Sequence, residues 1–186
     1  MSQLLGLGSE DESMEGAERV REAMERNVKA VTLRPAVARG TAVTKVRLGP
    51  GLECEAAEGH WRMTVGMTDK YGGSNAGPNP GVYGRTALGS CPAIGYALWA
   101  ARLGVPLDAL EVEIQADYDA RGELGVADDV RPGYSEIRYV VRVESPAPEA
   151  DVLHLLDTAE RYSSYRDDFA NAVPLRREVH ITASIR

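Results

Sequence analysis

Apolar residues recur every three or four positions in several stretches of the chain, which predicts amphipathic helices. Residues 10–31 carry such a stripe, with a capping-box pattern at Ser9 and Glu12. Residues 82–103 are apolar on nearly every side, which is typical of a buried central helix. Two further helices are predicted near the C-terminus (residues 148–162 and 163–172).

Other stretches alternate apolar and polar residues, which predicts half-buried strands. The first three are separated by short Gly-containing turns, so we expect an antiparallel meander. Strands and helices are segregated along the chain rather than alternating one by one, which indicates the α+β class. The predicted strands are residues 41–48, 52–56, 61–67, 110–120, 134–144 and 178–185.

Composition narrows the possible functions. The 186 residues include 28 Asp and Glu against 21 Lys and Arg, a net charge of −7, so we expect no nucleic-acid partner. No apolar run is long enough to span a membrane, and the N-terminus lacks a basic secretory signal, so we expect a cytoplasmic protein with no membrane partner. Two cysteines exclude a disulfide scaffold, and the three histidines lack metal-ligand spacing, so we expect neither metal nor cofactor.

Cys91 is the candidate reactive residue, and two interpretations of it are open. A cysteine on an apolar helix face is most often a small buried hydrophobe. However, Pro92 follows it directly and should kink the helix. If Pro92 starts a new helical segment, Cys91 becomes its N-cap, and the helix dipole lowers the pKa of the thiol.

Two other features are weaker candidates for a reactive or ligand-binding site. Cys54 lies between Glu53 and Glu55, whose carboxylates disfavour a thiolate, so we interpret it as incidental. The Gly- and Pro-rich loop over residues 71–81 lacks the Lys-Ser/Thr ending of a phosphate-binding loop. We expect this loop to be a turn that leads into the central helix.

Four motifs together resemble one known family. Gly77-Pro-Asn-Pro80 precedes Ala87-Leu-Gly-Ser-Cys91 on the apolar helix, and Leu103-Gly-Val105 leads into the next strand. Ala159-Glu-Arg-Tyr162 then stands near the C-terminus. This order resembles the OsmC/Ohr family of thiol-dependent organic hydroperoxide reductases. The resemblance covers roughly residues 30–186, so we expect an N-terminal helical extension (residues 1–32) and a single OsmC-like domain (residues 33–186).

The resemblance implies a two-layer α+β fold in which antiparallel sheets wrap around the central helices of an intertwined homodimer. It places the peroxidatic thiol at Cys91 and offers Arg39 as the nearest match to the activating arginine. Ser163 stands where the family has its resolving cysteine, and Gly81 stands where hydroperoxide-reducing members have an activating glutamate. Arg85, six residues before Cys91, falls on a different side of the helix.

Two functional hypotheses follow from these residues. In the first, the protein reduces organic hydroperoxides in oxidative-stress defence, with Cys91 as the single redox thiol and an external thiol as reductant. In the second, a non-catalytic homodimer binds a small apolar ligand beside Cys91. The absent resolving cysteine and activating glutamate favour the second hypothesis, whereas the match at Cys91 favours the first.

Overall fold

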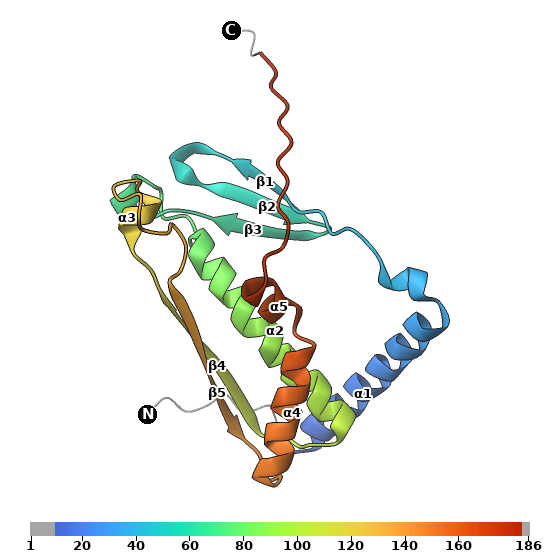
Figure 1. Cartoon of the computed structure of the whole chain (residues 1–186). Helices are drawn as coiled ribbons and strands as arrows, with labels where there is room; N and C mark the ends of the chain where they lie inside the picture. Colours follow the sequence, from blue (N-terminus) through green and yellow to red (C-terminus); the bar gives the residue numbers. More distant parts are fainter. Residues whose placement is uncertain (1–9, 184–186) are drawn as a thin grey trace.

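The computed structural model describes residues 10–183 as five α-helices and two small antiparallel sheets, which confirms the predicted α+β class (Figure 1). Most predicted elements are present with ends shifted by a few residues. In chain order they are α1 (Glu10–Leu33), β1 (Lys45–Leu48), β2 (Cys54–Glu58), β3 (Trp61–Val65), α2 (Pro80–Leu103), β4 (Ala109–Asp117), α3 (Ala120–Glu123), β5 (Glu136–Glu144), α4 (Glu149–Arg161) and α5 (Ser164–Ala170).

The first sheet is the predicted meander, with strand order β1-β2-β3. Val46, Ala56 and Met63 are paired across the three strands, so their side chains share one face of the sheet. The second sheet is the hairpin of β4 and β5. In β5, alternate residues are partly buried and exposed, as the sequence pattern predicts for a strand with one wet face.

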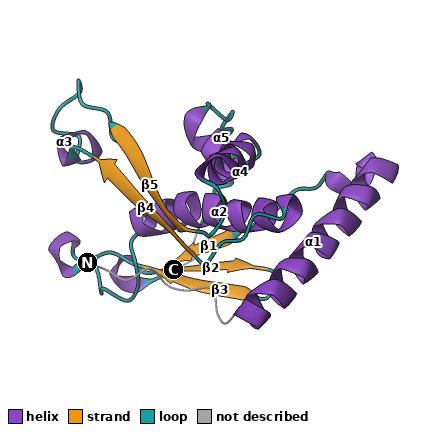
Figure 2. Cartoon of the chain, turned by 90° about the horizontal axis from the view of Figure 1, so that it is seen from below, coloured by secondary structure: helices purple, strands orange, loops and turns teal. Residues whose placement is uncertain are grey.

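Helix α2 runs through the middle of the molecule, beside the β4–β5 hairpin and α4 (Figures 1 and 2). It begins at Asn79, whose side chain accepts a hydrogen bond from the Val82 N–H at 3.0 Å, and Pro80 occupies its first turn. Gly89 is buried where α2 crosses β4, and a Cβ there would lie 3.1 Å from Ile114. Within residues 10–183, no helix is long and apolar enough to cross a bilayer.

The described core is small and lies where α2 meets α4 and the hairpin. Ala100, Leu107 and Leu155 form a buried cluster, against which Trp99 and Val143 pack. Tyr96 and Leu155 are the largest side chains in the described chain that are fully buried. Burying a leucine or an aromatic side chain contributes about 1.5–3 kcal/mol, so these few contacts hold α4 against α2.

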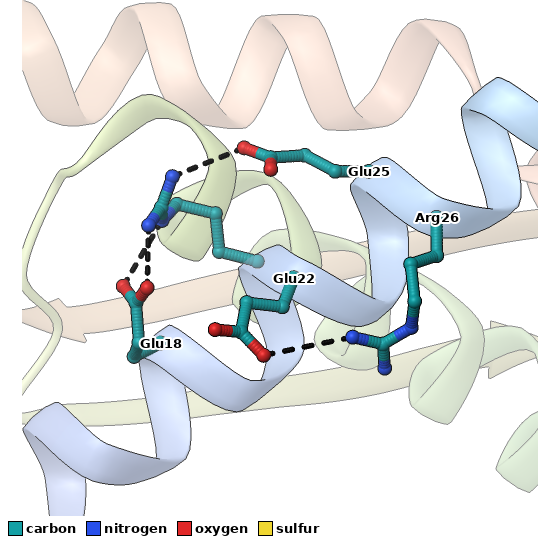
Figure 3. Close-up of polar contacts among 5 residues, drawn as sticks. Glu18, Glu22, Glu25 and Arg26 are labelled. Carbon is teal, nitrogen blue, oxygen red and sulfur yellow. Dashed lines mark hydrogen bonds and ion pairs between the residues drawn. The ribbon is translucent and has the colours of Figure 1, made fainter.

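Helix α1 presents a charged face to solvent and packs with another face on α2. On the charged face, Arg21 binds Glu18 and Glu25, and Arg26 binds Glu22 at 3.5 Å (Figure 3). These pairs are three or four residues apart, which places their side chains side by side on a helix.

The C-terminal segment differs from its prediction. Residues 171–183 follow α5 without regular structure, so the strand predicted over 178–185 is wrong for its described part, and Ile185 lies outside the described residues. An alternating pattern becomes a strand only where a partner strand supplies hydrogen bonds, and within residues 10–183 none pairs with this segment. Leu175 and Ile181 are therefore more than nine-tenths exposed.

Candidate active site

Cys91 lies in the middle of α2, and the helix continues past Pro92 to Leu103. Because the residues on both sides of Cys91 are helical, it is not an N-cap, and that part of the sequence interpretation is wrong. The thiol is partly buried and both cysteines are unbonded. Any donors that stabilise a thiolate must therefore come from another element.

Those donors come from the start of α5. The Cys91 Sγ atom lies 3.6 Å from the Ser163 hydroxyl and 3.7 Å from the Ser164 hydroxyl. Ser163 is also the N-cap of α5, since its Oγ accepts a hydrogen bond from the Arg166 N–H at 3.4 Å. The short connection between α4 and α5 places both serines beside the thiol.

Two opposing effects set the acidity of Cys91. Burial on its own raises the pKa of the thiol, because a low-dielectric environment disfavours the thiolate. The backbone N–H of Tyr165, the hydroxyls of Ser163 and Ser164, and the Ser164 N–H act in the opposite direction. Together these hydrogen bonds hold the pKa of Cys91 below its ordinary value. The thiolate is the nucleophile, so the site favours the reactive form of the residue.

A polar network holds α5 in this position. The Tyr96 hydroxyl donates to Glu160 Oε1 at 2.9 Å, and Arg166 forms an ion pair with Glu160 Oε2 at 3.5 Å. Burial and the adjacent Glu160 carboxylate raise the pKa of Tyr96 far above its ordinary range, so the phenol remains a donor. Arg166 lies in α5 only three residues after Ser163, so the network fixes the first turn of that helix.

An open cavity of about 810 Å³ adjoins the thiol. Its volume lies in the range typical of sites for small organic ligands. Apolar side chains from α2, α4 and α1 form most of its walls, and Arg102 is its charged lining residue. The described lining residues are Met24, Ala87, Ser90, Cys91, Ile94, Gly95, Leu98, Trp99, Arg102, Ala159, Tyr162, Ser163, Ser164 and Tyr165.

The remaining predicted site residues lie elsewhere. Arg39 follows the 3₁₀ turn Pro35–Ala38, is exposed, and is not among the described residues that line the cavity. Gly81 is in the first turn of α2, where Arg85 donates to the Tyr134 hydroxyl at 2.7 Å. Cys54 lies in β2 opposite Val65, outside the lining of the cavity. Of the predicted residues, the structure therefore brings together Cys91 and Ser163.

Sequence reasoning missed Ser164 and Arg102. Ser164 could have been found from the Ser-Ser pair that precedes the predicted short helix. Arg102 follows Cys91 by eleven residues, which is close to three full turns and places both on one helix face. Among the side chains that the structure describes, no cluster of three or more His, Cys, Asp or Glu could hold a metal ion.

Comparison with known proteins agrees with the motifs and the fold. Residues 72–178 match the family described as OsmC-like protein. The fold is similar to an OsmC like protein from Mycoplasma pneumoniae, at 14% identity and a TM-score of 0.62, over 72% of this chain and 89% of that chain. It is also similar to an organic hydroperoxide resistance protein OsmC from Legionella pneumophila, at 14% identity and a TM-score of 0.52, over 70% of this chain and 89% of that chain.

A third similar structure is an osmotic stress induced and detoxification response protein from Psychrobacter arcticus 273-4. Its identity is 14% and its TM-score 0.54, over 70% of this chain and 89% of that chain. Comparison with curated protein sequences gives no significant match. The matched family segment spans more than half of the sequence and contains both Cys91 and Ser163. The chain therefore belongs to the OsmC-like protein family.

Proposed function

We propose that this protein reduces organic hydroperoxides, with Cys91 as its single redox thiol, in defence against oxidative stress. The observation that carries the proposal is the set of hydrogen-bond donors from the start of α5, which lowers the pKa of Cys91. An apolar cavity beside the thiol suits an organic peroxide. The names of similar proteins, one of them an organic hydroperoxide resistance protein, point to the same chemistry.

In the first step, the Cys91 thiolate attacks the terminal oxygen of the peroxide. An S–O bond forms, the O–O bond breaks, and the leaving alkoxide takes a proton and departs as an alcohol. Sulfur is oxidised to a sulfenic acid while the peroxide is reduced. The hydroxyls of Ser163 and Ser164 orient the thiolate before attack and stay within reach of the new S–OH group.

The second step needs an external thiol, because Ser163 lies where an intramolecular partner would be. One thiol condenses with the sulfenic acid, which releases water and leaves a mixed disulfide on Cys91. A second thiol attacks that disulfide, which returns the Cys91 thiolate and releases an oxidised dimer of the reductant. We therefore expect a low-molecular-weight thiol or dithiol as co-substrate, in the reducing environment of the cytoplasm.

A second candidate function is ligand binding without catalysis. No acidic side chain is among the described lining residues, and Arg39 lies outside them. In this case the protein is a non-catalytic homodimer whose cavity holds a small apolar ligand beside an unreactive Cys91.

Turnover distinguishes the two functions. We expect the wild-type protein to consume cumene hydroperoxide when dithiothreitol is present, and we expect Cys91→Ser to lose this activity. Cys54→Ser is the matched control, because Cys54 lies in β2 away from the cavity and its loss should leave the rate unchanged. If several hydroperoxides and reductants give no turnover above that of Cys91→Ser, the catalytic proposal is wrong and ligand binding remains.

We also propose that the protein acts as a homodimer. One face of the first sheet is apolar and exposed, with Leu48 71% and Trp61 66% accessible, and Ile94 on α2 is 61% accessible. Large exposed apolar patches are uncommon on monomers, and a second copy of the chain would bury them. Sedimentation should give a dimer at micromolar concentration, and a monomer there would contradict this assembly.

A further inference from the structure

A second open cavity, of about 510 Å³, lies between α5 and β5 and shares no described lining residue with the cavity at Cys91. Its walls come from α2, from the loop before β5, from β5 itself and from α5, and we call it the β5 cavity. The start of α5 lines the cavity at Cys91, whereas Arg166 and later residues of that helix line the β5 cavity. The proposed chemistry at Cys91 leaves the β5 cavity without a role.

Aromatic side chains form much of the wall of the β5 cavity. Tyr134, Tyr139 and Phe169 contribute three rings, and α2 and β5 add aliphatic surface. The Tyr134 ring is held in place because its hydroxyl accepts a hydrogen bond from Arg85 at 2.7 Å. Aromatic rings favour stacked or edge-to-face contacts with another ring. The volume is in the range typical of sites for small organic ligands, so the cavity suits a compact planar molecule.

Two arginines also line the β5 cavity, and one of them carries an uncompensated charge. Arg166 forms an ion pair with Glu160 at 3.5 Å. Glu136, the acidic lining residue, forms an ion pair with Arg138 at 2.9 Å. Arg131 forms no ion pair within the part of the chain that the structure describes. The β5 cavity therefore has one free positive charge in a protein whose net charge is −7.

The loop that carries Arg131 is held by close packing. Helix α3 lies at the end of the β4–β5 hairpin (Figures 1 and 2). A Cβ at Gly122 in α3 would lie 2.5 Å from the carbonyl oxygens of both Val130 and Arg131, so only glycine allows this approach. The Arg131 guanidinium lies beside Gly133, where a Cβ would be 3.6 Å from Nη2. Because its backbone is held in place, Arg131 loses less conformational freedom when it binds an anion.

We propose that the β5 cavity binds a small aromatic carboxylate, with the carboxylate on Arg131 and the ring against Tyr134, Tyr139 and Phe169. A guanidinium donates two parallel N–H bonds to a carboxylate, which fixes the orientation of the ligand. The single free charge of the cavity matches a monoanion, whereas a phosphate dianion would bring excess negative charge close to Glu136. The inference goes beyond the proposed function, because it concerns a separate cavity and requires no reaction at Cys91.

Binding of a matched pair of ligands tests the contact with Arg131. The probes 2-naphthoate and its neutral methyl ester have the same ring, and each is titrated calorimetrically into the full-length protein. Arg131→Gln should weaken 2-naphthoate binding roughly ten- to a hundred-fold, the range for a lost hydrogen bond to a charged group, and should leave the ester unchanged. Arg121→Gln is the control, because Arg121 lies in the same hairpin connection, pairs with Asp119 and lines neither cavity.

A second comparison tests the aromatic wall. Octanoate has the same charge as 2-naphthoate on a flexible chain, so the wild type should bind 2-naphthoate about tenfold more tightly. Phe169→Leu keeps an apolar side chain on α5 but removes its ring, and the preference for 2-naphthoate over octanoate should fall in this variant. An unchanged preference in Phe169→Leu would contradict the placement of the ring against α5.

Three results would overturn the inference as a whole. They are no binding of 2-naphthoate at millimolar concentration, equal affinity of the wild type for acid and ester, and equal 2-naphthoate affinity in Arg131→Gln and Arg121→Gln. A loss of affinity in Arg102→Gln instead of Arg131→Gln would place the ligand at Cys91 and would also overturn it. Hydroperoxide turnover is measured without 2-naphthoate, so the enzymatic proposal and the carboxylate site can each fail while the other stands.

Discussion

Ser163→Cys should place a second thiol where it can form a disulfide with Cys91. The Ser163 Oγ atom already lies 3.6 Å from Cys91 Sγ, and the longer Cβ–S bond extends the side chain further toward it. A small rotation about the side-chain bonds would bring the two sulfurs to bonding distance. We therefore expect mild oxidation to join α2 to the start of α5 by a covalent bond.

The stability that this disulfide adds follows from the length of the loop that it closes. Cys91 and Ser163 are 72 residues apart in the sequence. Cross-linking a loop of this length removes chain entropy from the unfolded state worth about 4 kcal/mol, an upper value because strain in the native state subtracts from it. For a chain of this size, that free energy corresponds to a rise in the melting temperature of roughly 10 °C.

The assay counts free thiols and measures the melting temperature before and after oxidation with diamide. Ser163→Cys should have three free thiols when reduced and one, Cys54, when oxidised, with a peptide linking positions 91 and 163 in a non-reducing digest. Ser90→Cys is the matched control, since it also lines the cavity but points about 100° away from Cys91 around the helix. Three free thiols after oxidation, or a bridge of equal yield in Ser90→Cys, would refute the placement of Ser163 over the thiol.

Three further predictions concern acidity and stability. Ser163→Ala removes one donor from the Cys91 thiolate and raises its pKa, so the pH profile of alkylation should move to higher pH; an unchanged profile would show that the hydroxyl does not stabilise the thiolate. Tyr96→Phe removes the hydrogen bond to Glu160 and should lower the free energy of unfolding by about 1.5–3 kcal/mol in urea titration, whereas no loss would mean that the network does not hold α5. Leu155→Ala should lower the free energy of unfolding by about 2–5 kcal/mol, because the Leu155 side chain is fully buried. A change below about 1 kcal/mol would contradict the assignment of Leu155 to the core.

The sequence determined those features whose physical cause is local. Asn79-Pro80 supplies an N-cap and a first-turn proline, so the start of α2 was predictable to within two residues. The alternation over residues 136–144 required a strand with one buried face, and β5 has that burial pattern. The four motifs between Gly77 and Tyr162 identified the family, because the order of residues along the chain is enough to read them.

Pro92 shows where local reasoning was insufficient. Proline lacks an N–H, and the sequence interpretation had Pro92 start a new helical segment, yet α2 continues as one helix from Pro80 to Leu103. Pro92 itself is buried, and the contacts of α2 with β4 and α4 favour a continuous helix despite the loss of one backbone hydrogen bond. The hydrogen-bond donors that lower the pKa of Cys91 belong to α5, whereas the sequence interpretation had placed them at the start of a new segment of α2.

Contacts between distant segments were decided only by the tertiary structure. Ser163 and Ser164 reach Cys91 because Tyr96, Glu160 and Arg166 hold α5 against α2, and no spacing in the sequence reports such a contact. The alternating pattern near the C-terminus predicted a strand, but no described strand pairs with this segment. Its described residues therefore have no regular structure. A residue pattern sets which conformations a segment can adopt, whereas hydrogen-bond partners and burial, which other segments supply, decide which one it takes.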